Sequence, residues 1–353
     1  DGWYYIMCAE GGTGYNHSVT MGRSRNVWGP YEPDPNGPLV TSQPKESNER
    51  ADDDHLKPRY FNPDSVLQKS GHGSYVDLPN GETYLVHLTS RSFVPELRCT
   101  LGRETAIQKM QWTPDGWLRM ADGSNLAKIE VEEPNLPDVP MPEIPSLDDF
   151  DGEELGNWYY SPRQMPSTFA NATERPGWLR VRGEESLASL NRTSLLARKL
   201  TSVYATVTTK MEFEPEVYQH SAGLTIYYDN MNNIFLRKYY SQTLGGSAIS
   251  IVRLENGEKM EMLDTRVAVE DKPIYFRLNI EGRRTWFEWG YDGENWTKIG
   301  PDFDTTTFSD EYCKYGEFTG TMVGIAVTDA ALHEKTADFD FFDYEADETK
   351  PVD

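Results

Sequence analysis

Short strand-like segments separated by tight turns recur along most of the chain, and no stretch shows an extended helical period. Residues 73–78 and 82–88 are two such segments, and they meet at Asn80-Gly81. This dipeptide accepts the positive φ angles of a two-residue hairpin turn. A second pair, residues 107–112 and 117–120, encloses another turn. The pattern is typical of an all-β protein and limits the fold more than any other feature of the sequence.

Strand–turn–strand units of this length predict the four-stranded blades of a β-propeller. Residues 1–128 would hold about two blades, which are too few to close a ring. The apolar run from Trp3 to Glu10 is expected to form a buried central strand. Because the preceding Asp1-Gly2 pair is a turn dipeptide, we expect the chain to begin within the fold, with further strands upstream.

Proline then becomes frequent, in the run VEEPNLPDVPMPEIP. Proline cannot donate to a sheet ladder and favours a stiff, extended connector, so residues 129–146 are predicted to form a linker. Residues 147–346 return to strand-like segments in which polar and apolar side chains alternate, and this predicts a two-sheet antiparallel sandwich. Residues 347–353 are interpreted as a tail.

The 353 residues include 57 acidic and 34 basic side chains, which gives a formal net charge of −23. A nucleic-acid partner needs a cationic surface, so this balance argues against one. No segment approaches the roughly 20 apolar residues of a membrane-spanning helix, so no membrane partner is expected. A neutral or cationic ligand suits the charge better, and the abundant aromatic side chains can stack on sugars.

Cys8, Cys99 and Cys313 are too few and too widely spaced for a disulfide framework or a zinc cluster. Each lies in an apolar or strand-like run, so we expect small buried thiols. Unpaired cysteines favour the cytoplasm over secretion. A signal peptide would lie upstream of Asp1, so the location is left unassigned and secretion stays open.

Two polar side chains flank the predicted hairpin at Asn80-Gly81. Arg103 follows a Leu-Gly pair, and its guanidinium can hold a carboxylate or sugar hydroxyls and lower the pKa of a neighbouring carboxyl group. The alternative is a structural ion pair with Glu104. His72 lies between two glycines at a strand entrance, where an imidazole can act as base, hydrogen-bonding group or metal ligand. The alternative is a structural histidine, and no further ligand set supports zinc.

Glycosidic bond cleavage normally needs two carboxyl groups, one as acid and one as base or nucleophile. Glu10, Asp64 and Glu104 are candidates by position, but no spacing singles out a pair. A serine triad is no better supported, because no G-x-S-x-G turn is present. Taken alone, the residues do not supply a catalytic set.

Longer motifs resemble one known family, the β-xylosidases of glycoside hydrolase family 43. The part that resembles their last two propeller blades is YYIMCAEGGTGYNHSVTMGRS, NPDSVLQKSGHGSYVDLPNGETYLVHLTSR and LGRETAIQKMQWTPDGW. The part that resembles their C-terminal β-sandwich is SLLARK, AGLTIYYDN, FTGTMVGIAVTD and ADFDFFDY. The resemblance implies a partial five-bladed β-propeller followed by a concanavalin-like antiparallel β-sandwich.

The activity implied is that of an inverting exo-β-1,4-xylosidase, which releases xylose from the non-reducing end of xylo-oligosaccharides. An α-L-arabinofuranosidase of the same family is the alternative, and a non-catalytic carbohydrate-binding fragment is the rival from another class. The family uses an Asp base, a Glu acid and a second Asp that tunes the acid. All three are expected upstream of Asp1, so no catalytic residue is assigned within this chain, and Glu10 belongs to a glycine-rich bend instead.

The resemblance also assigns roles to four residues. Arg103 matches an arginine that contacts the substrate and the catalytic Asp, and Thr13 matches a residue near the bound sugar. His72 matches a histidine at the propeller centre that supports the site through water or a calcium ion, although no cofactor is required. Phe318 matches an aromatic that the sandwich inserts as a pocket wall; the alternative is a core aromatic beside a glycine turn.

The expected partners are xylo-oligosaccharides and the N-terminal propeller blades, supplied as another chain or as a preceding segment. A homo-oligomer is also expected.

Overall fold

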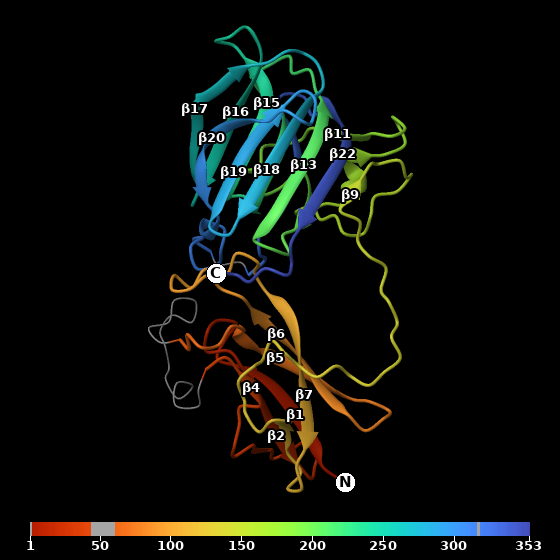
Figure 1. Cartoon of the computed structure of the whole chain (residues 1–353), viewed down its shortest axis with the longest axis vertical. Coiled ribbons are helices and arrows are strands. Elements are labelled where there is room, and N and C mark those ends of the chain that lie inside the picture. Colours follow the sequence, from red (N-terminus) through yellow and green to blue (C-terminus); the bar gives the residue numbers. More distant parts are fainter. Residues whose placement is uncertain (1, 44–60, 316–317) are drawn as a thin grey trace. The chain divides into compact units, whose positions relative to one another are not determined.

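The structure is a computed structural model, and it describes residues 2–43, 61–315 and 318–353 (Figure 1). The chain forms two compact units: the first comprises residues up to Met141 together with Phe318, and the second comprises nearly all residues from Pro142 onward. Within the described ranges there is no α-helix, only the short 3-10 helices Pro166–Thr168 and Thr305–Thr307. No helix there is long and apolar enough to span a membrane. The predicted all-β class is confirmed.

The first unit contains two antiparallel sheets of four strands each. In the first sheet β2 is central: it pairs with β1 along its whole length and with two short strands on its other edge. The strands are β1 (Tyr4–Glu10), β2 (Ser18–Ser24), β3 (Glu32–Pro33) and β4 (Val40–Thr41).

The second sheet is a meander in chain order. The predicted hairpin at Asn80-Gly81 joins its first two strands, because the Leu78 amide donates to the Glu82 carbonyl at 2.7 Å and Gly81 has a φ of +87°. The strands are β5 (Gln68–Asp77), β6 (Thr83–Ser90), β7 (Glu104–Trp112) and β8 (Leu118–Met120). Each sheet has the four strands predicted for a propeller blade.

One expectation for this unit is wrong. The apolar strand β1 was expected to be buried, but its residues are exposed or half-buried, and Cys8 is an exposed thiol. Among the described strands β1 pairs only with β2, so it is an edge strand. Cys99 and Cys313 are buried free thiols, as expected.

The two sheets of the first unit share an apolar core and one buried ion pair. Val19 and Met21 of β2 pack in the same cluster as Leu85 of β6. Asp34 lies just after β3 and accepts hydrogen bonds from the two terminal guanidinium nitrogens of Arg119 in β8. The distance from Arg119 Nη2 to Asp34 Oδ1 is 2.6 Å. The Asp34 side chain is only 1% exposed, so the pair joins the two sheets in a desolvated setting.

Removing the charge of Asp34 is therefore expected to destabilise the first unit. Asp34→Asn leaves the Arg119 guanidinium largely buried without its counter-charge, which should lower the free energy of unfolding by about 3 kcal/mol. Equilibrium unfolding in urea measures the loss. The matched control is Glu132→Gln, which removes the exposed partner of Lys109 and should cost less than about 1 kcal/mol. Equal losses in the two variants would contradict the buried role of Asp34.

The second unit is a sandwich of two antiparallel sheets. The six-stranded sheet has the order β12 (Ser194–Lys199), β21 (Met322–Asp329), β14 (His220–Asp229), β15 (Asn232–Ser241), β16 (Gly246–Glu255) and β17 (Glu258–Ala268).

The eight-stranded sheet has the order β10 (Ala170–Asn171), β11 (Leu179–Arg182), β22 (Thr336–Ala346), β13 (Tyr204–Glu212), β18 (Ile274–Glu281), β19 (Arg284–Gly290) and β20 (Thr297–Asp304), with β9 (Leu147–Asp148) also on β22.

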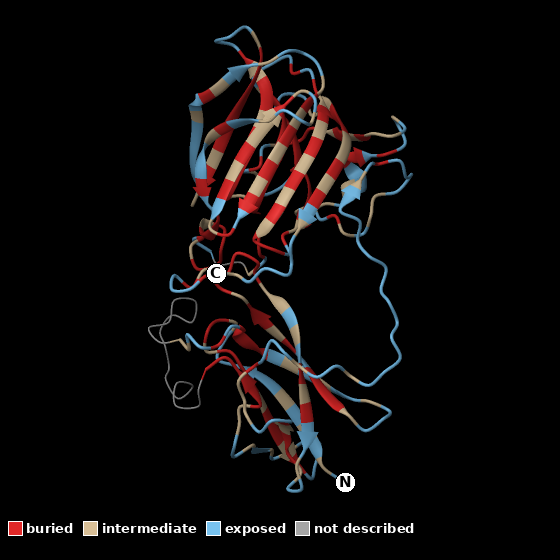
Figure 2. Ribbon diagram, in the orientation of Figure 1, coloured by how far each residue is buried: buried red, intermediate tan, exposed pale blue. Residues whose placement is uncertain are grey.

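The sequence alternation anticipated this packing. Figure 2 shows buried and half-buried residues alternating along β13 and β18, as a strand with one face on a core requires. Val207, Phe276 and Phe287 of this sheet are fully buried.

Candidate active-site wall

A glycine-rich bend, residues 11–14, leads the chain from β1 back into β2. Gly11 has a φ of +77°, and a Cβ atom there would lie 1.8 Å from the Asn16 carbonyl oxygen. Only glycine can occupy this position without moving the backbone. The tight bend also sets the direction of the half-buried Thr13.

Arg103 approaches this bend from the second sheet. It lies immediately before β7 and follows Gly102, which has a φ of +71°. Its Nη2 donates to the Thr13 carbonyl oxygen at 2.7 Å, and its Cζ lies 4.7 Å from the centre of the Phe318 ring. The structure thus brings together three of the four predicted site residues, with Thr13 taking part through its backbone.

Glu104, proposed as an ion-pair partner for Arg103, is engaged by another arginine. Arg91 donates from Nη2 to Oε1 at 2.7 Å and from Nε to Oε2 at 3.1 Å. Through this bidentate contact the Glu104 carboxylate forms a structural ion pair with Arg91. Of the other carboxyl candidates, Glu10 lies exposed at the end of β1 and Asp64 is exposed in a loop.

His72 lies at an irregular point of β5. The pairing of β5 with β6 shifts register on both sides of Gly71, and His72 has a φ of +53°. Such bulges redirect a side chain away from the regular alternation of a strand. The His72 ring is exposed, and its centre lies 6.2 Å from the ring of His17 in an edge-to-face arrangement.

His17 was not singled out from the sequence. Its side chain is buried, with Nδ1 3.2 Å from the Lys69 carbonyl oxygen, and its ring packs on Gly71, where a Cβ atom would come within 2.4 Å. Burial lowers the pKa of His17 to about 4; the bond to Lys69 opposes this, and the nearby His72 and Arg103 lower it further. His17 is therefore neutral at pH 7.

The sequence offered little signal for this histidine. His17 follows the glycine-rich bend directly, but its partner Lys69 lies 52 positions further along the chain. Only the packing of the two sheets brings them together. Gly71, the residue before His72, is the position whose missing side chain makes room for the His17 ring.

A calcium ion at His72 is not supported by the side chains around it. Among the described residues, no group of three or more His, Cys, Asp or Glu side chains is arranged to hold a metal. Calcium prefers oxygen ligands, whereas His72 offers a ring nitrogen, and the positive charge of Arg103 is close enough to lower the pKa of the neighbouring His17. The calcium expectation therefore stays a prediction that depends on water or on residues outside those described.

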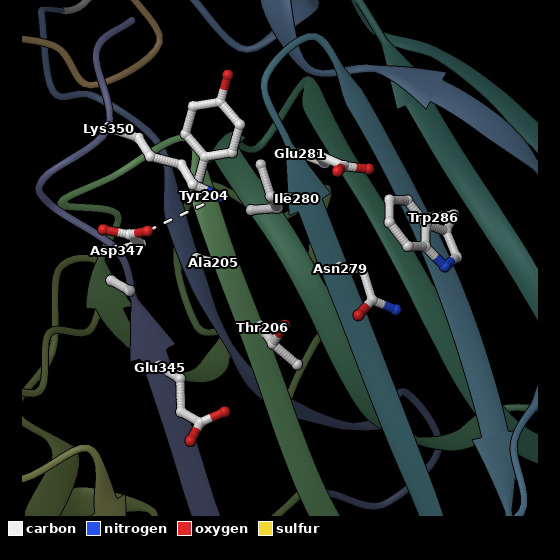
Figure 3. A pocket seen from close by; sticks show the side chains of 11 residues that line it. Tyr204, Ala205, Thr206, Asn279, Ile280, Glu281, Trp286, Glu345, Asp347 and Lys350 are labelled. Atoms are coloured by element: carbon white, nitrogen blue, oxygen red, sulfur yellow. Dashed lines mark ion pairs between the residues drawn. The ribbon is translucent and has the colours of Figure 1, made fainter.

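The sandwich carries its own hollow, of about 440 Å³, on the eight-stranded sheet (Figure 3). Tyr204 and Trp286 line it, but cations already cover these rings: Lys350 Nζ lies 4.6 Å from the centre of Tyr204 and Arg284 Cζ lies 4.3 Å from that of Trp286. Lys350 also forms an ion pair with Asp347. The remaining charged lining is acidic, from Glu281 and Glu345.

Comparison with protein families matches both units. A family described as glycosyl hydrolases family 43 matches residues 1–118, and one described as the β-xylosidase C-terminal concanavalin A-like domain matches residues 147–345. The chain belongs to glycosyl hydrolase family 43. The predicted class, a family 43 propeller part followed by a concanavalin-like sandwich, is thereby confirmed.

Individual relatives of this chain support its membership of family 43. It is 35% identical over 98% of its length to a Vibrio protein named xylan 1,3-β-xylosidase, covering 63% of that protein. It is 36% identical over 98% of its length to xylosidase/arabinosidase 43B of Humicola insolens, covering 62%. The crystal structure of xylan β-1,4-xylosidase from Bacillus halodurans C-125 superposes with a TM-score of 0.89 at 41% identity, covering 98% of this chain and 63% of that one. The chain thus spans less than two thirds of these relatives.

The buried, neutral state of His17 predicts a pH effect on stability. The pKa is about 4 in the folded chain, against an ordinary value of 6.5 for histidine, so as pH falls the unfolded state takes up the proton first. The contribution of His17 to stability is then complete above pH 6.5 and is lost as pH falls toward 4, by up to about 3 kcal/mol. The gap in unfolding free energy between the native protein and His17→Gln should shrink over this range. A gap independent of pH would contradict the assignment.

Proposed function

We propose that this chain forms part of an inverting exo-β-1,4-xylosidase that releases xylose from the non-reducing end of xylo-oligosaccharides. The observation that carries the proposal is the position of Arg103, held by the Thr13 carbonyl and beside the Phe318 ring. Membership of family 43 and the names of the relatives support the substrate class.

In this proposal Arg103 acts on both the sugar and a carboxyl group. Its planar guanidinium can donate to adjacent sugar hydroxyls, and its permanent charge lowers the pKa of a facing carboxyl group so that it stays ionised as the base. The base activates a water molecule, and the protonated acid gives its proton to the leaving oxygen. An inverting pair stands roughly 6.5–9.5 Å apart to leave room for that water.

We assign the base, the acid and the tuning carboxylate to propeller blades outside this chain's sequence, supplied by a preceding segment or by a second chain. Glu104, Glu10 and Asp64 are not assigned to these roles, because Glu104 binds Arg91 and the other two are exposed. Phe318 closes one side of the sugar site and His72 supports it, with His17 fixed in its neutral form behind His72.

The first test replaces the arginine. In the whole protein, Arg103→Ala should lower kcat/KM for xylobiose by about a hundredfold or more, because an interaction with the reacting groups is lost. Arg284→Ala, at an exposed arginine that pairs with Asp302, is the matched control and should leave kcat/KM unchanged. Unchanged activity in Arg103→Ala would refute the site assignment. Failure of the native protein to release xylose would refute the function.

The choice of substrate is a separate question. The Humicola relative is named a xylosidase/arabinosidase and the Vibrio relative a 1,3-β-xylosidase. We propose the β-1,4-xyloside as the preferred substrate, and rates on nitrophenyl β-xyloside and nitrophenyl α-L-arabinofuranoside, and on β-1,4- and β-1,3-linked xylobiose, measure the preference. A higher kcat/KM for the arabinofuranoside would favour the alternative activity.

A carbohydrate-binding function without catalysis is the second candidate. The hollow in Figure 3 favours it through its polar lining of Thr206, Asn279 and Glu281, because the Tyr204 and Trp286 rings are already covered by Lys350 and Arg284. The two functions predict different assemblies. A native assembly whose intact mass includes blades carrying the three carboxylates supports the enzyme, and an assembly of this chain alone supports the binding protein. The same mass tests the expected homo-oligomer.

We further propose that catalysis needs no metal. The acid–base chemistry described above is performed by carboxyl groups, and the side chains around His72 are a poor calcium donor set. Dialysis against a chelator should therefore leave kcat for xylobiose within about twofold of its starting value. Loss of activity that added Ca²⁺ restores would instead establish calcium at the site.

A further inference from the structure

Two buried histidines, His17 and His87, lie close together in the first unit, and their hydrogen bonds determine where each ring carries its proton. Nδ1 of His17 lies 3.2 Å from the Lys69 carbonyl oxygen. Because a carbonyl oxygen only accepts, the proton of the neutral His17 ring is on Nδ1. Nε2 of His17 is therefore a bare acceptor. Burial lowers the pKa of this ring to about 4, so the acceptor stays unprotonated at pH 7.

His87 carries its proton on the same ring nitrogen. Its Nδ1 lies 3.0 Å from the Leu88 carbonyl oxygen, and its Nε2 lies 3.2 Å from Gln108 Nε2. The Lys128 backbone amide donates to Gln108 Oε1, which fixes the orientation of the Gln108 side chain and makes its Nε2 the donor to His87. Both hydrogen-bonding positions of the His87 ring are thus occupied.

The acceptor of His17 differs from that of His87, because no described residue donates a hydrogen bond to it. Nε2 of His17 is also not one of the side-chain atoms that are both unpartnered and enclosed in the described part of the chain. This nitrogen therefore keeps contact with accessible space, although the residue as a whole is buried. A bare acceptor in such a position normally binds water.

His72 is a side chain that needs an orienting partner. Its ring is exposed and forms no hydrogen bond with any residue that the structure describes. Its backbone φ of +53° is costly for a residue other than glycine, and such strain gathers at functional sites. Within the described ranges its ring contacts only the His17 ring, edge to face, with 6.2 Å between the centres. That separation leaves room for one water molecule between a nitrogen of each ring.

We propose that His17 is a positioning residue: its Nε2 accepts a hydrogen bond from one water molecule that also bonds a ring nitrogen of His72, and this link fixes the direction in which His72 faces the sugar. Gly71 permits the link, because a Cβ atom there would come within 2.4 Å of the His17 ring and displace it. The inference rests on the proposed function, since it concerns the site at which that function places the sugar.

Two substitutions at position 17 separate this role from a structural one. In His17→Asn the amide nitrogen stands as far along the side chain as Nδ1 and still donates to the Lys69 carbonyl, but nothing replaces Nε2. In His17→Gln the amide reaches as far as Nε2 and offers an acceptor there, but the Lys69 carbonyl loses its donor. In the whole protein, kcat for xylobiose should be about tenfold or more lower in His17→Asn than in His17→Gln, although His17→Asn should unfold at the higher temperature.

His87→Asn is the matched control, because it shortens the second buried histidine and keeps a donor for the Leu88 carbonyl. It should lower the unfolding temperature without the loss of kcat expected for His17→Asn. An equal loss of kcat in the two Asn variants would overturn the proposal, since it would show that shortening any buried histidine in this region has the same effect.

The NMR signals of the His72 ring provide a readout that does not depend on turnover. They should be alike in the native protein and in His17→Gln and should shift in His17→Asn. Activity that follows stability, with His17→Gln the less active variant, or His72 signals that do not respond to His17→Asn, would overturn the proposal and leave His17 a structural residue. If the native protein releases no xylose while the His72 signals respond as expected, the proposed function fails and the link from His17 to His72 is supported.

Discussion

The hydrogen bond from Arg103 to the Thr13 carbonyl is the contact on which the candidate site of the first unit depends. It joins the start of β7 in one sheet to the bend after β1 in the other. Each end is shaped by a glycine, since Gly11 leaves no room for a side chain and Gly102 adopts a positive φ. The result is a guanidinium of fixed orientation beside the Phe318 ring. A fixed donor fork loses little entropy when it binds a sugar or a carboxylate.

His17 adds to this arrangement without adding a charge at pH 7. His17 is buried beside Gly71, and burial together with its charged neighbours keeps its pKa low. Arg103 adds a permanent positive charge beside His17, in a chain with a net charge of −23. Such a setting suits carboxyl groups that must stay ionised and a sugar that carries no charge, as expected for hydrolysis of a neutral glycoside.

Much of the fold followed from local patterns. Turn dipeptides and alternating side chains predicted the hairpin at Asn80-Gly81 and the two-sheet sandwich, because both features are encoded within a few residues. The burial of β1 was mispredicted, since an apolar strand does not reveal whether its sheet neighbours cover it. The site was less accessible to sequence reasoning. His17 and Gly71 meet only through the packing of two sheets. Phe318 lies close to Arg103 although the two residues are more than 200 positions apart in the sequence. Family resemblance suggested this closeness, and no local sequence pattern did.

The most direct test of the central claim is the anomeric form of the first product. Proton NMR can follow hydrolysis of nitrophenyl β-xyloside, which releases a single xylose, by the whole protein faster than xylose mutarotates. An inverting exo-xylosidase releases α-xylose from the non-reducing end, and the β-anomer appears only later by mutarotation. Initial appearance of β-xylose, or no xylose at all, would contradict the account.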